Sequence, residues 1–268
     1  MARNPYTEIE SGGPGRIGWR IHYFDEVDST QQVAAELAGQ GAAQGTVVVA
    51  ESQNAGRGRM GRRWHSPPGV NLYSTTILRP SMPLAEVPRL SLVAGVAAAE
   101  ALETVAPGLV ALKWPNDIWL NGRKSGGIIA EVVTDARQRL TCVLLGIGLN
   151  VNLALSDIPP ELRDRATSVR IATARRCDRI ALAEALFERL DQRYVETQTS
   201  GFAAVRPLWE RYSALTGKRV VIVDGDTRIE GVVRGIDGDG ALLLENGGTL
   251  KRIIAGDVNV EGAYESST

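Results

Sequence analysis

The stretch between Val110 and Asn152 constrains the fold most strongly, because strand-like segments follow one another there with only short turns between them. It reads VALKWPNDIWLNGRKSGGIIAEVV and, after a short polar gap, RLTCVLLGIGLNVN. Runs rich in β-branched and other apolar residues, bounded by turn residues, are typical of strands. An Asn-Gly pair at Asn121 and a second turn near Asp135 join these runs. We therefore expect three central strands and a β-sheet at the centre of the fold.

Further strand-like and helix-like segments lie on both sides of this stretch. Alternating or β-branched runs predict strands, and alanine- and leucine-rich runs with apolar residues at helical spacing predict helices. We expect strands at residues 19–27, 45–52 and 71–80 and helices at residues 28–41, 90–102, 178–198 and 202–215. This order of elements predicts an α+β fold in which a central mixed β-sheet carries flanking helices.

The pattern of apolar runs and turn residues changes at about Thr216. From there to Val260, short apolar runs alternate with Asp-Gly, Asp-Gly-Asp-Gly and Asn-Gly-Gly turns. This spacing predicts a series of short strands that closes into a small β-barrel of SH3-like size. We therefore expect two domains, a larger one over residues 1–215 and a small C-terminal β-barrel domain over residues 216–268.

Composition limits the classes of function. The chain has 268 residues, 44% of them hydrophobic, and a formal net charge of -1, which argues against a general polyanion-binding protein. Two histidines exclude a histidine-rich metal site, and Cys142 and Cys177 lack metal-ligand spacing. The most apolar helix-like run, Leu90 to Leu102, is too short to cross a bilayer. We expect a cytoplasmic protein that has no membrane partner and carries any basic cluster as a local site.

Residues 56–64 read GRGRMGRRW and contain the pattern G-x-G-x-x-G. That pattern marks a dinucleotide-binding turn only where it joins a strand to a helix. Here RRWHSPPGVN follows, and two successive prolines cannot continue a helix, so the dinucleotide interpretation fails. A solvated basic loop is the plain alternative for this segment.

The four arginines of this loop favour an anionic ligand. Glycines leave backbone N–H groups free to donate, and the guanidinium fork of arginine matches carboxylate and phosphate oxygens. The tryptophan that ends the run, Trp64, can cover an aromatic or apolar ligand face. We expect a mobile clamp over a phosphate-bearing ligand, ordered by ligand binding because the isolated stretch has nothing to pack on.

A second cluster, KWPNDIWLNGRKSGG, spans residues 113–127. It is compatible with an ordinary β-hairpin around an Asn-Gly turn. A proline followed by Asn116 and Asp117 is unusual inside a strand, however, because proline breaks the hydrogen-bond ladder. The alternative is a bent strand that points Asn116 and Asp117 at a ligand or cation, with Lys113 and Lys124 supplying positive charge.

The two clusters together resemble the biotin protein ligases. The resemblance is carried, in the family's order, by DSTQ (28–31), ESQNAGRGRMGRRW (51–64), KWPNDIWLNGRKSGGIIAE (113–131) and GIGLNVN (146–152). It implies a class II synthetase-like catalytic domain that joins biotin to ATP in the presence of Mg²⁺, giving biotinyl-5′-AMP and pyrophosphate. The acyl group then passes to one lysine of the biotin carboxyl carrier domain of acetyl-CoA carboxylase or a related carboxylase.

The resemblance also implies roles for individual residues. The implied catalytic residues are Lys124, Arg57 and Arg59. The implied biotin-binding residues are Ser29, Thr30, Gln53, Gly56, Arg57, Lys124, Gly127 and Gly148. The implied nucleotide-binding residues are Arg59, Arg62, Trp64, Lys113, Asn116, Asn150 and Arg252. Asp117 is the implied magnesium ligand.

Some features depart from the family's pattern or leave alternatives open. Gln31 stands where the family commonly has asparagine, and we expect it to keep a role at the start of a helix. Fewer than twenty residues precede the first expected strand, so we expect a dedicated ligase that binds no nucleic acid, either a monomer or a homodimer. The rival interpretations are a lipoate or octanoate ligase on the same scaffold and a non-enzymatic nucleotide- or RNA-binding protein.

Overall fold

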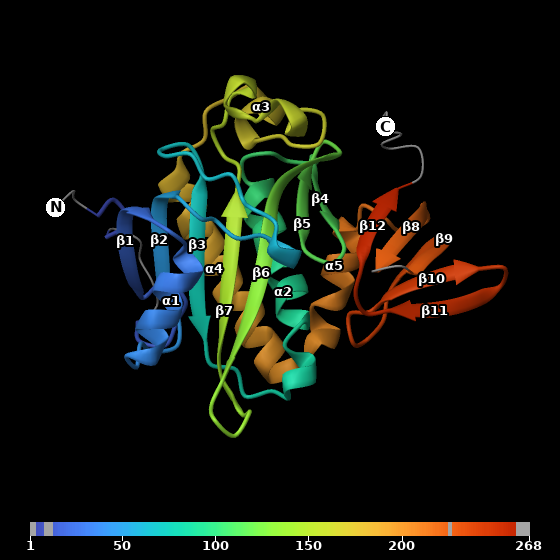
Figure 1. Cartoon of the computed structure of the whole chain (residues 1–268), viewed down its shortest axis with the longest axis horizontal. Coiled ribbons are helices and arrows are strands. Elements are labelled where there is room, and N and C mark those ends of the chain that lie inside the picture. Colours follow the sequence, from blue (N-terminus) through green and yellow to red (C-terminus); the bar gives the residue numbers. More distant parts are fainter. Residues whose placement is uncertain (1–3, 8–12, 225–226, 261–268) are drawn as a thin grey trace.

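The computed structural model describes residues 4–7, 13–224 and 227–260, and a seven-stranded sheet lies at its centre (Figure 1). The strand order is β1 (Arg20–Val27), β2 (Thr46–Gln53), β3 (Leu72–Leu78), β7 (Leu140–Leu149), β6 (Arg123–Thr134), β5 (Asp117–Leu120) and β4 (Val110–Lys113). β1 and β2 are parallel, and all other neighbours in this sheet are antiparallel. The predicted central mixed sheet is therefore confirmed.

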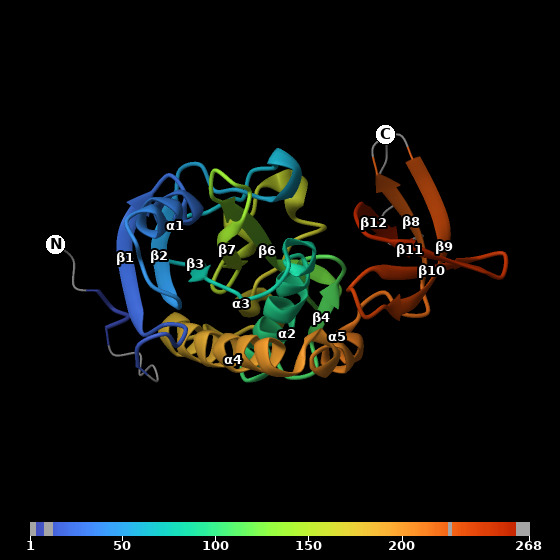
Figure 2. The ribbon, with the colours of Figure 1, turned by 90° about the horizontal axis from the view of Figure 1, so that it is seen from below.

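Helices lie on both faces of the sheet (Figure 2). The helices α2 (Arg89–Glu103), α4 (Arg179–Ser200) and α5 (Arg206–Tyr212) lie on one face, and α1 (Thr30–Gly39) lies on the other. α2 belongs to the larger core, because nearly all of its alanine, valine and leucine side chains are buried. Ala34 of α1 packs in a smaller cluster with Val48, Ile77 and Leu144. Burial from both sides explains why every residue of β3 is buried.

The central stretch contains four strands where the sequence predicted three. β4 ends at Lys113 and β5 begins at Asp117, and these two residues pair with each other. Pro115 has no N–H to donate to a neighbouring strand, so the chain turns through Trp114, Pro115 and Asn116 instead of continuing as one strand. The turn leaves Asn116 and Asp117 at one end of the sheet.

Local sequence signals explain other boundaries. Asn121 and Gly122 adopt φ angles of 48° and 77°, the left-handed conformation that an Asn-Gly hairpin turn requires. Asp178 caps α4, because its Oδ1 accepts a hydrogen bond of 2.9 Å from the backbone N–H of Ile180. The helix predicted over residues 202–215 is shorter than expected. A single 3₁₀ turn precedes α5, and Pro207 lies in the first turn of α5, where its missing N–H has no intrahelical partner.

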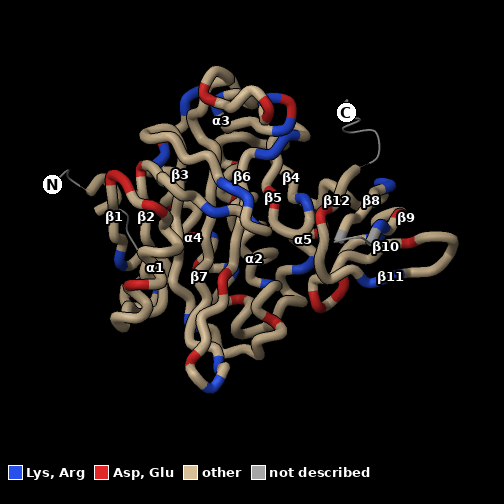
Figure 3. The backbone as a smooth tube through the Cα atoms, viewed as in Figure 1, with Lys and Arg blue, Asp and Glu red and all other residues tan. Residues whose placement is uncertain are grey.

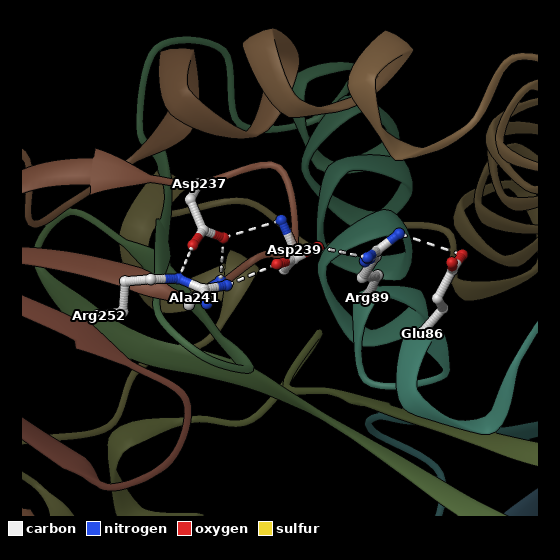
Figure 4. A network of polar contacts seen from close by, with 6 residues as sticks. All are labelled: Glu86, Arg89, Asp237, Asp239, Ala241 and Arg252. Carbon is white, nitrogen blue, oxygen red and sulfur yellow. Dashed lines mark hydrogen bonds and ion pairs between the residues drawn. The ribbon is translucent and has the colours of Figure 1, made fainter.

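A separate five-stranded antiparallel sheet follows, in the part of the chain where the sequence predicted a small SH3-like β-barrel. Its strand order is β11 (Thr249–Ile253), β10 (Leu242–Asn246), β9 (Thr227–Ile236), β8 (Arg219–Asp224) and β12 (Asp257–Val260). The unit contacts the turn between β4 and β5, where Trp114 Nε1 donates a 2.9 Å hydrogen bond to the carbonyl of Gly240. Arg89 of α2 reinforces this contact by pairing with Glu86 at 3.1 Å and with Asp239 at 2.7 Å (Figure 4).

Two general properties bear on function. In the described part of the chain, no helix is long and apolar enough to cross a membrane.

Cys142 and Cys177 are free cysteines, and burial raises the pKa of both thiols. Since the thiolate is the reactive form of cysteine, neither residue is set up as a nucleophile.

Candidate active site

A platform of glycines lies on the face of the sheet that carries α1. It consists of Gly127, Gly146 and Gly148, and the register pairs Gly127 of β6 with Gly148 of β7. A Cβ atom at Gly148 would lie 2.8 Å from Trp64 Nε1, and one at Gly127 would lie 3.4 Å from Trp64 Cζ3. The indole of Trp64 therefore packs directly on the backbone of the sheet, which only glycine permits at Gly148. We call these three residues the glycine platform.

Polar side chains gather at the start of α1. The Oε1 atom of Gln53 accepts hydrogen bonds from the backbone N–H of Thr30 at 3.0 Å and from its hydroxyl at 3.1 Å. Thr75 donates to the Thr30 hydroxyl at 2.9 Å, and Gln53 Nε2 donates to Ser66 Oγ at 3.0 Å. The structure thus brings the predicted Thr30 and Gln53 together and adds Thr75 and Ser66. Sequence reasoning missed these two residues, because hydroxyls in a strand and in a loop carry no motif.

Ser29 and Gln31 flank this polar network and are both almost completely buried. Ser29 occupies the N-cap position of α1, but its side chain makes no capping hydrogen bond, and its Oγ has no described partner. The Nε2 atom of Gln31 donates to the carbonyl of Leu144 at 3.3 Å, whereas its Oε1 is also without a described partner. Because buried polar groups are normally hydrogen-bonded, both atoms have unused hydrogen-bonding capacity at this end of the site.

The arginine-containing loop is folded back on itself. Arg57 bridges to Arg63, Gly58 N donates to the carbonyl of Arg62 at 2.7 Å, and Trp64 N donates to the carbonyl of Gly56 at 2.9 Å. A Cβ atom at Gly56 would lie 2.7 Å from the Trp64 carbonyl, so this position needs glycine. We call residues 56–64 the arginine loop. It has internal hydrogen bonds and packs through its tryptophan, which corrects the prediction that it has nothing to pack on.

The conformation of the loop agrees with the exclusion of a dinucleotide-binding turn. Its tip is a single 3₁₀ turn, Arg59–Gly61, and no α-helix follows before β3. Met60 has a φ of 57° and a largely exposed side chain. In Figure 1 the loop crosses the face of the sheet over β6 and β7. It therefore covers the glycine platform instead of opening a helix.

The three predicted loop arginines have three different partners. Arg57 Nη1 lies 3.8 Å from Glu131 Oε1 on β6. Arg59 Nη1 donates to Asn116 Oδ1 at 3.1 Å, at the turn between β4 and β5. Arg62 Nη2 pairs with Asp257 Oδ1 at 2.9 Å, on the first residue of β12. These contacts fix the loop to β6, to the turn between β4 and β5, and to β12 of the C-terminal sheet. Asp257 had no sequence motif that could have identified it.

Lys124 lies at the centre of the charged groups. Its Nζ is 2.6 Å from Asp117 Oδ1 and 5.6 Å from the centroid of the Trp64 ring. Its backbone is held from both sides, since its N–H donates to the Arg165 carbonyl and its carbonyl accepts from the Thr167 N–H, both at 2.8 Å. Residues 165–167, which hold this backbone, lead into α3 (Val169–Thr173). Figure 3 shows basic residues around α3 and over β6. Lys124 is therefore a rigidly supported cation beside the platform.

Lys113 adds a second cation close to Lys124. Its ammonium lies 5.3 Å from the centroid of the Trp119 ring. Burial lowers the pKa of Lys113, the carboxylates of Asp117 and Asp257 oppose this shift, and the charge of Lys124 adds to it. Two ammonium groups with one intervening carboxylate make a site suited to phosphate or carboxylate oxygens. Neither histidine lies among these groups.

Two further predicted nucleotide-binding residues also have protein partners. The Nδ2 of Asn150 donates to the carbonyl of Thr167 at 3.0 Å, and Asn150 is buried. Arg252 pairs with Asp237 and, at 2.6 Å, with Asp239, in the network that continues to α2 (Figure 4). Asn150 therefore supports the segment that holds Lys124, and Arg252 supports the contact between the two sheets.

These residues could hold a magnesium ion only together with oxygen atoms of a bound ligand. Among the described residues no group of three or more histidine, cysteine, aspartate or glutamate side chains could hold a metal by itself. Mg²⁺ is commonly bound through one or two carboxylates together with substrate phosphates. Asp117 supplies one such carboxylate, and Lys124 already neutralises it.

Two models of known protein families match the chain. Residues 23–150 match the Biotin/lipoate A/B protein ligase family. Residues 215–260 match the Biotin protein ligase C terminal domain. The first match covers the polar network, the arginine loop and both lysines, and the second covers the five-stranded sheet. These matches define the class, the ligases that share a catalytic domain for biotin or lipoate. Within this class the chain belongs to the biotin protein ligase family, as its relatives show.

Individual relatives agree with this assignment. The chain is 39% identical over 244 residues to the bifunctional ligase/repressor BirA of Bacillus subtilis, covering 91% of this chain and 75% of the relative. It is 34% identical over 250 residues to the biotin–[acetyl-CoA-carboxylase] ligase of Mycobacterium tuberculosis, covering 90% and 89%. The structure resembles the biotin protein ligase of Aquifex aeolicus in complex with biotin and ATP, with a TM-score of 0.78, 30% identity and coverage of 90% and 98%.

Proposed function

We propose that this protein is an ATP-dependent biotin–protein ligase. It joins biotin to ATP to give biotinyl-5′-AMP and pyrophosphate, and it then transfers the biotinyl group to one lysine of a carrier domain. The observation that carries this function is the position of Lys124, whose Nζ lies 2.6 Å from Asp117 and 5.6 Å from the Trp64 ring, beside the glycine platform. Membership of the biotin protein ligase family supports it.

The first half-reaction needs charge neutralisation more than covalent chemistry. A carboxylate oxygen of biotin attacks the α-phosphorus of ATP, and the bond to the departing pyrophosphate breaks. Two anions must approach each other, so positioning and preorganised cations supply most of the catalysis. In this proposal Lys124 contacts both the reacting carboxylate and the α-phosphate. Arg57 and Arg59 close the site from the arginine loop, which excludes water from the mixed anhydride.

The second half-reaction uses the same site. The amine of the carrier lysine attacks the acyl carbon of biotinyl-5′-AMP, an amide bond forms, and AMP leaves with the bonding electrons. The carrier lysine gives up one proton to become a neutral amine before the attack and a second proton as the amide forms, and solvent water takes both.

Biotin binds between the polar network and the platform in this proposal. Its ureido group has both donors and acceptors, which match Thr30, Gln53 and the unpaired hydroxyl of Ser29. The rest of the molecule takes the place over Gly127 and Gly148 that the indole of Trp64 covers in this structure, so Trp64 moves when biotin binds. Further contacts come from the backbone of the loop at residues 56–57.

The nucleotide occupies the neighbouring cluster of cations. We assign the phosphates to Arg59, Arg62 and Lys113, which surround Asn116 and Asp117, and the adenine to Trp64. Asp117 would hold Mg²⁺, and the ion would supply charge neutralisation on the phosphates. The described partners of Asn150 and Arg252 make both of these residues indirect contributors to nucleotide binding.

The domain organisation and the partners follow from the same proposal. Residues 1–215 form the catalytic domain and residues 216–268 form the C-terminal domain. The protein partner is the biotin carboxyl carrier domain of acetyl-CoA carboxylase or a related carboxylase. The ligase acts as a monomer or a homodimer.

One experiment tests the function directly. The protein is incubated with biotin, Mg-ATP and a purified biotin carboxyl carrier domain, and the carrier is analysed by intact mass spectrometry. We expect the mass of one biotinyl group on a single lysine, and no gain on a carrier whose target lysine is replaced by arginine. Modification by lipoate or octanoate but not by biotin would assign the protein to the rival ligase class. Absence of any adenylate together with salt-dependent RNA binding would favour the non-enzymatic alternative.

A further inference from the structure

The tip of the arginine loop is fixed at two points that belong to different sheets. Arg59 Nη1 donates to Asn116 Oδ1 at 3.1 Å in the main sheet. Arg62 Nη2 pairs with Asp257 Oδ1 at 2.9 Å on β12 of the C-terminal sheet. Arg62 Nε also donates to the carbonyl of Arg59 at 3.3 Å, so that the two contacts are linked through the 3₁₀ turn. Movement of the tip away from the platform must break both of them.

Asp257 is well placed for this role because β12 does not move freely. β12 pairs with β8 along its whole length. The C-terminal sheet is held to the main sheet by the hydrogen bond from Trp114 to Gly240 and by the ion pair between Arg89 and Asp239 (Figure 4). A carboxylate on this rigid support offers the loop a fixed anchor.

Asp257 also lies near the cations of the site without taking part in the reaction in our proposal. The carboxylate of Asp257 raises the pKa of Lys113, whereas the charge of Arg62 lowers it. Through its ion pair with Arg62, Asp257 joins the C-terminal sheet to the charged cluster.

We propose that Asp257 is a positioning residue that holds the arginine loop over the site through Arg62, and so slows the escape of the reactive adenylate. The inference rests on the proposed function, because it concerns the lid of that same site. Both side chains are about half exposed, at 60% and 41%. Exposed ion pairs are weak, so we expect loss of the pair to change lid opening by about two- to fivefold.

The first test uses ligand-free protein and does not depend on activity. Amide hydrogen exchange is followed in the arginine loop of the wild type, of Asp257→Asn and of Glu245→Gln. The control removes a carboxylate of the same sheet that pairs with Arg234, away from the loop. We expect loop exchange to rise about two- to fivefold in Asp257→Asn only. Unchanged loop exchange, or an equal rise in Glu245→Gln, would overturn the proposal.

A variant on the loop side keeps the test decisive if Asp257→Asn loosens the C-terminal sheet as well. Arg62→Gln breaks the same pair without altering that sheet. Loop exchange must then rise as much as in Asp257→Asn, and the double variant must add nothing further. Additive effects of the two substitutions would show that the residues act separately.

The second test measures release of preformed biotinyl-5′-AMP in a chase experiment. We expect release to be about two- to fivefold faster in Asp257→Asn, and wild-type release to accelerate with added salt while that of the variant does not. Asp257→Glu, which keeps the carboxylate, should restore slow release. Equal release rates in wild type and Asp257→Asn would contradict the proposal for this residue alone. Failure of the wild type to form any adenylate would instead contradict the proposed function, and the exchange test would still decide the role of Asp257.

Discussion

The ammonium of Lys124 and the carboxylate of Asp117 are 2.6 Å apart, although they lie on different strands, β6 and β5. Asp117 reaches this place because the chain turns at Pro115 and starts a new strand. Lys124 reaches it because residues 165–167 hold its backbone on both sides. The pair keeps a charged lysine in one orientation before any substrate binds, which is what a preorganised electrostatic catalyst requires.

Replacing Lys124 by alanine should therefore abolish most of the adenylation rate without unfolding the protein. Losing one preorganised charge-assisted donor at a developing anion typically lowers the rate by about 10²–10³, or about 3–4 kcal/mol. The measurement is the steady-state rate of adenylate formation, with the melting temperature as the check on the fold. A rate close to that of the wild type would remove Lys124 from the reacting centre.

Replacing Arg57 by glycine should produce a different defect, leakage of the intermediate. The guanidinium lies at the edge of the arginine loop, 3.8 Å from Glu131, so its loss frees that edge and opens the lid to water. We expect biotinyl-5′-AMP to accumulate in solution, where it acylates lysines of unrelated proteins. The check is chromatographic separation of free from bound adenylate. Retention as tight as in the wild type would contradict the role of the loop as a clamp.

Replacing Gly148 by alanine should displace Trp64 from the platform. The added Cβ would lie 2.8 Å from the indole nitrogen, and overpacking of this kind typically costs about 1–3 kcal/mol. We expect the KM for biotin to rise about tenfold or more, measured by initial rates. Gly39→Ala is the matched control, because a Cβ there meets nothing within 4 Å and its KM should not change.

Replacing Lys113 by methionine should weaken nucleotide binding without lowering the stability of the fold. Burial lowers the pKa of Lys113, so the folded state disfavours its charge, and this group makes stability rise with pH up to its unfolded pKa of about 10.4. We expect the free energy of unfolding at pH 7 to stay equal or increase, measured by urea titration, and the rise toward pH 9 to shrink. The KM for ATP should increase about tenfold, since contacts to charged groups contribute about 1.5–3 kcal/mol.

The exposed Lys218 provides the control for this substitution. Lys218→Met should change neither the pH dependence of stability nor the KM for ATP. A lower stability of Lys113→Met at pH 7 would show that the ammonium stabilises the fold, against the direction given by its pKa.

Much of the fold could be predicted because local signals agree with the tertiary structure. The Asn-Gly turn at Asn121, the cap at Asp178 and the Asp-Gly turn that ends at Gly240 are set by residues a few positions apart, whereas the predicted turn at residues 225–226 lies outside the described residues. The prediction of three central strands was wrong, because the apolar pattern continues through Pro115 while the hydrogen-bond ladder does not. The missing N–H of Pro115 indicated a bend, but the sequence does not show whether the chain bends within one strand or begins a new one.

The site could be predicted only in part, for a related reason. Motifs identified the arginine loop and the segment from Lys113 to Lys124, since several chemical groups crowd a short stretch there. Thr75, Ser66 and Asp257 come from distant parts of the chain and carry no local signature. Their proximity arises from strand order and from the docking of the C-terminal sheet, and a single sequence read in order reveals neither.

The central claim is that this site activates biotin through its carboxylate, with Lys124 neutralising the charge. The most direct measurement is the exchange of labelled pyrophosphate into ATP, with biotin present or absent. We predict exchange that depends on biotin, is not supported by lipoate, and falls about 10²–10³-fold in Lys124→Ala. Exchange that proceeds without biotin, or that survives unchanged in Lys124→Ala, would contradict the account.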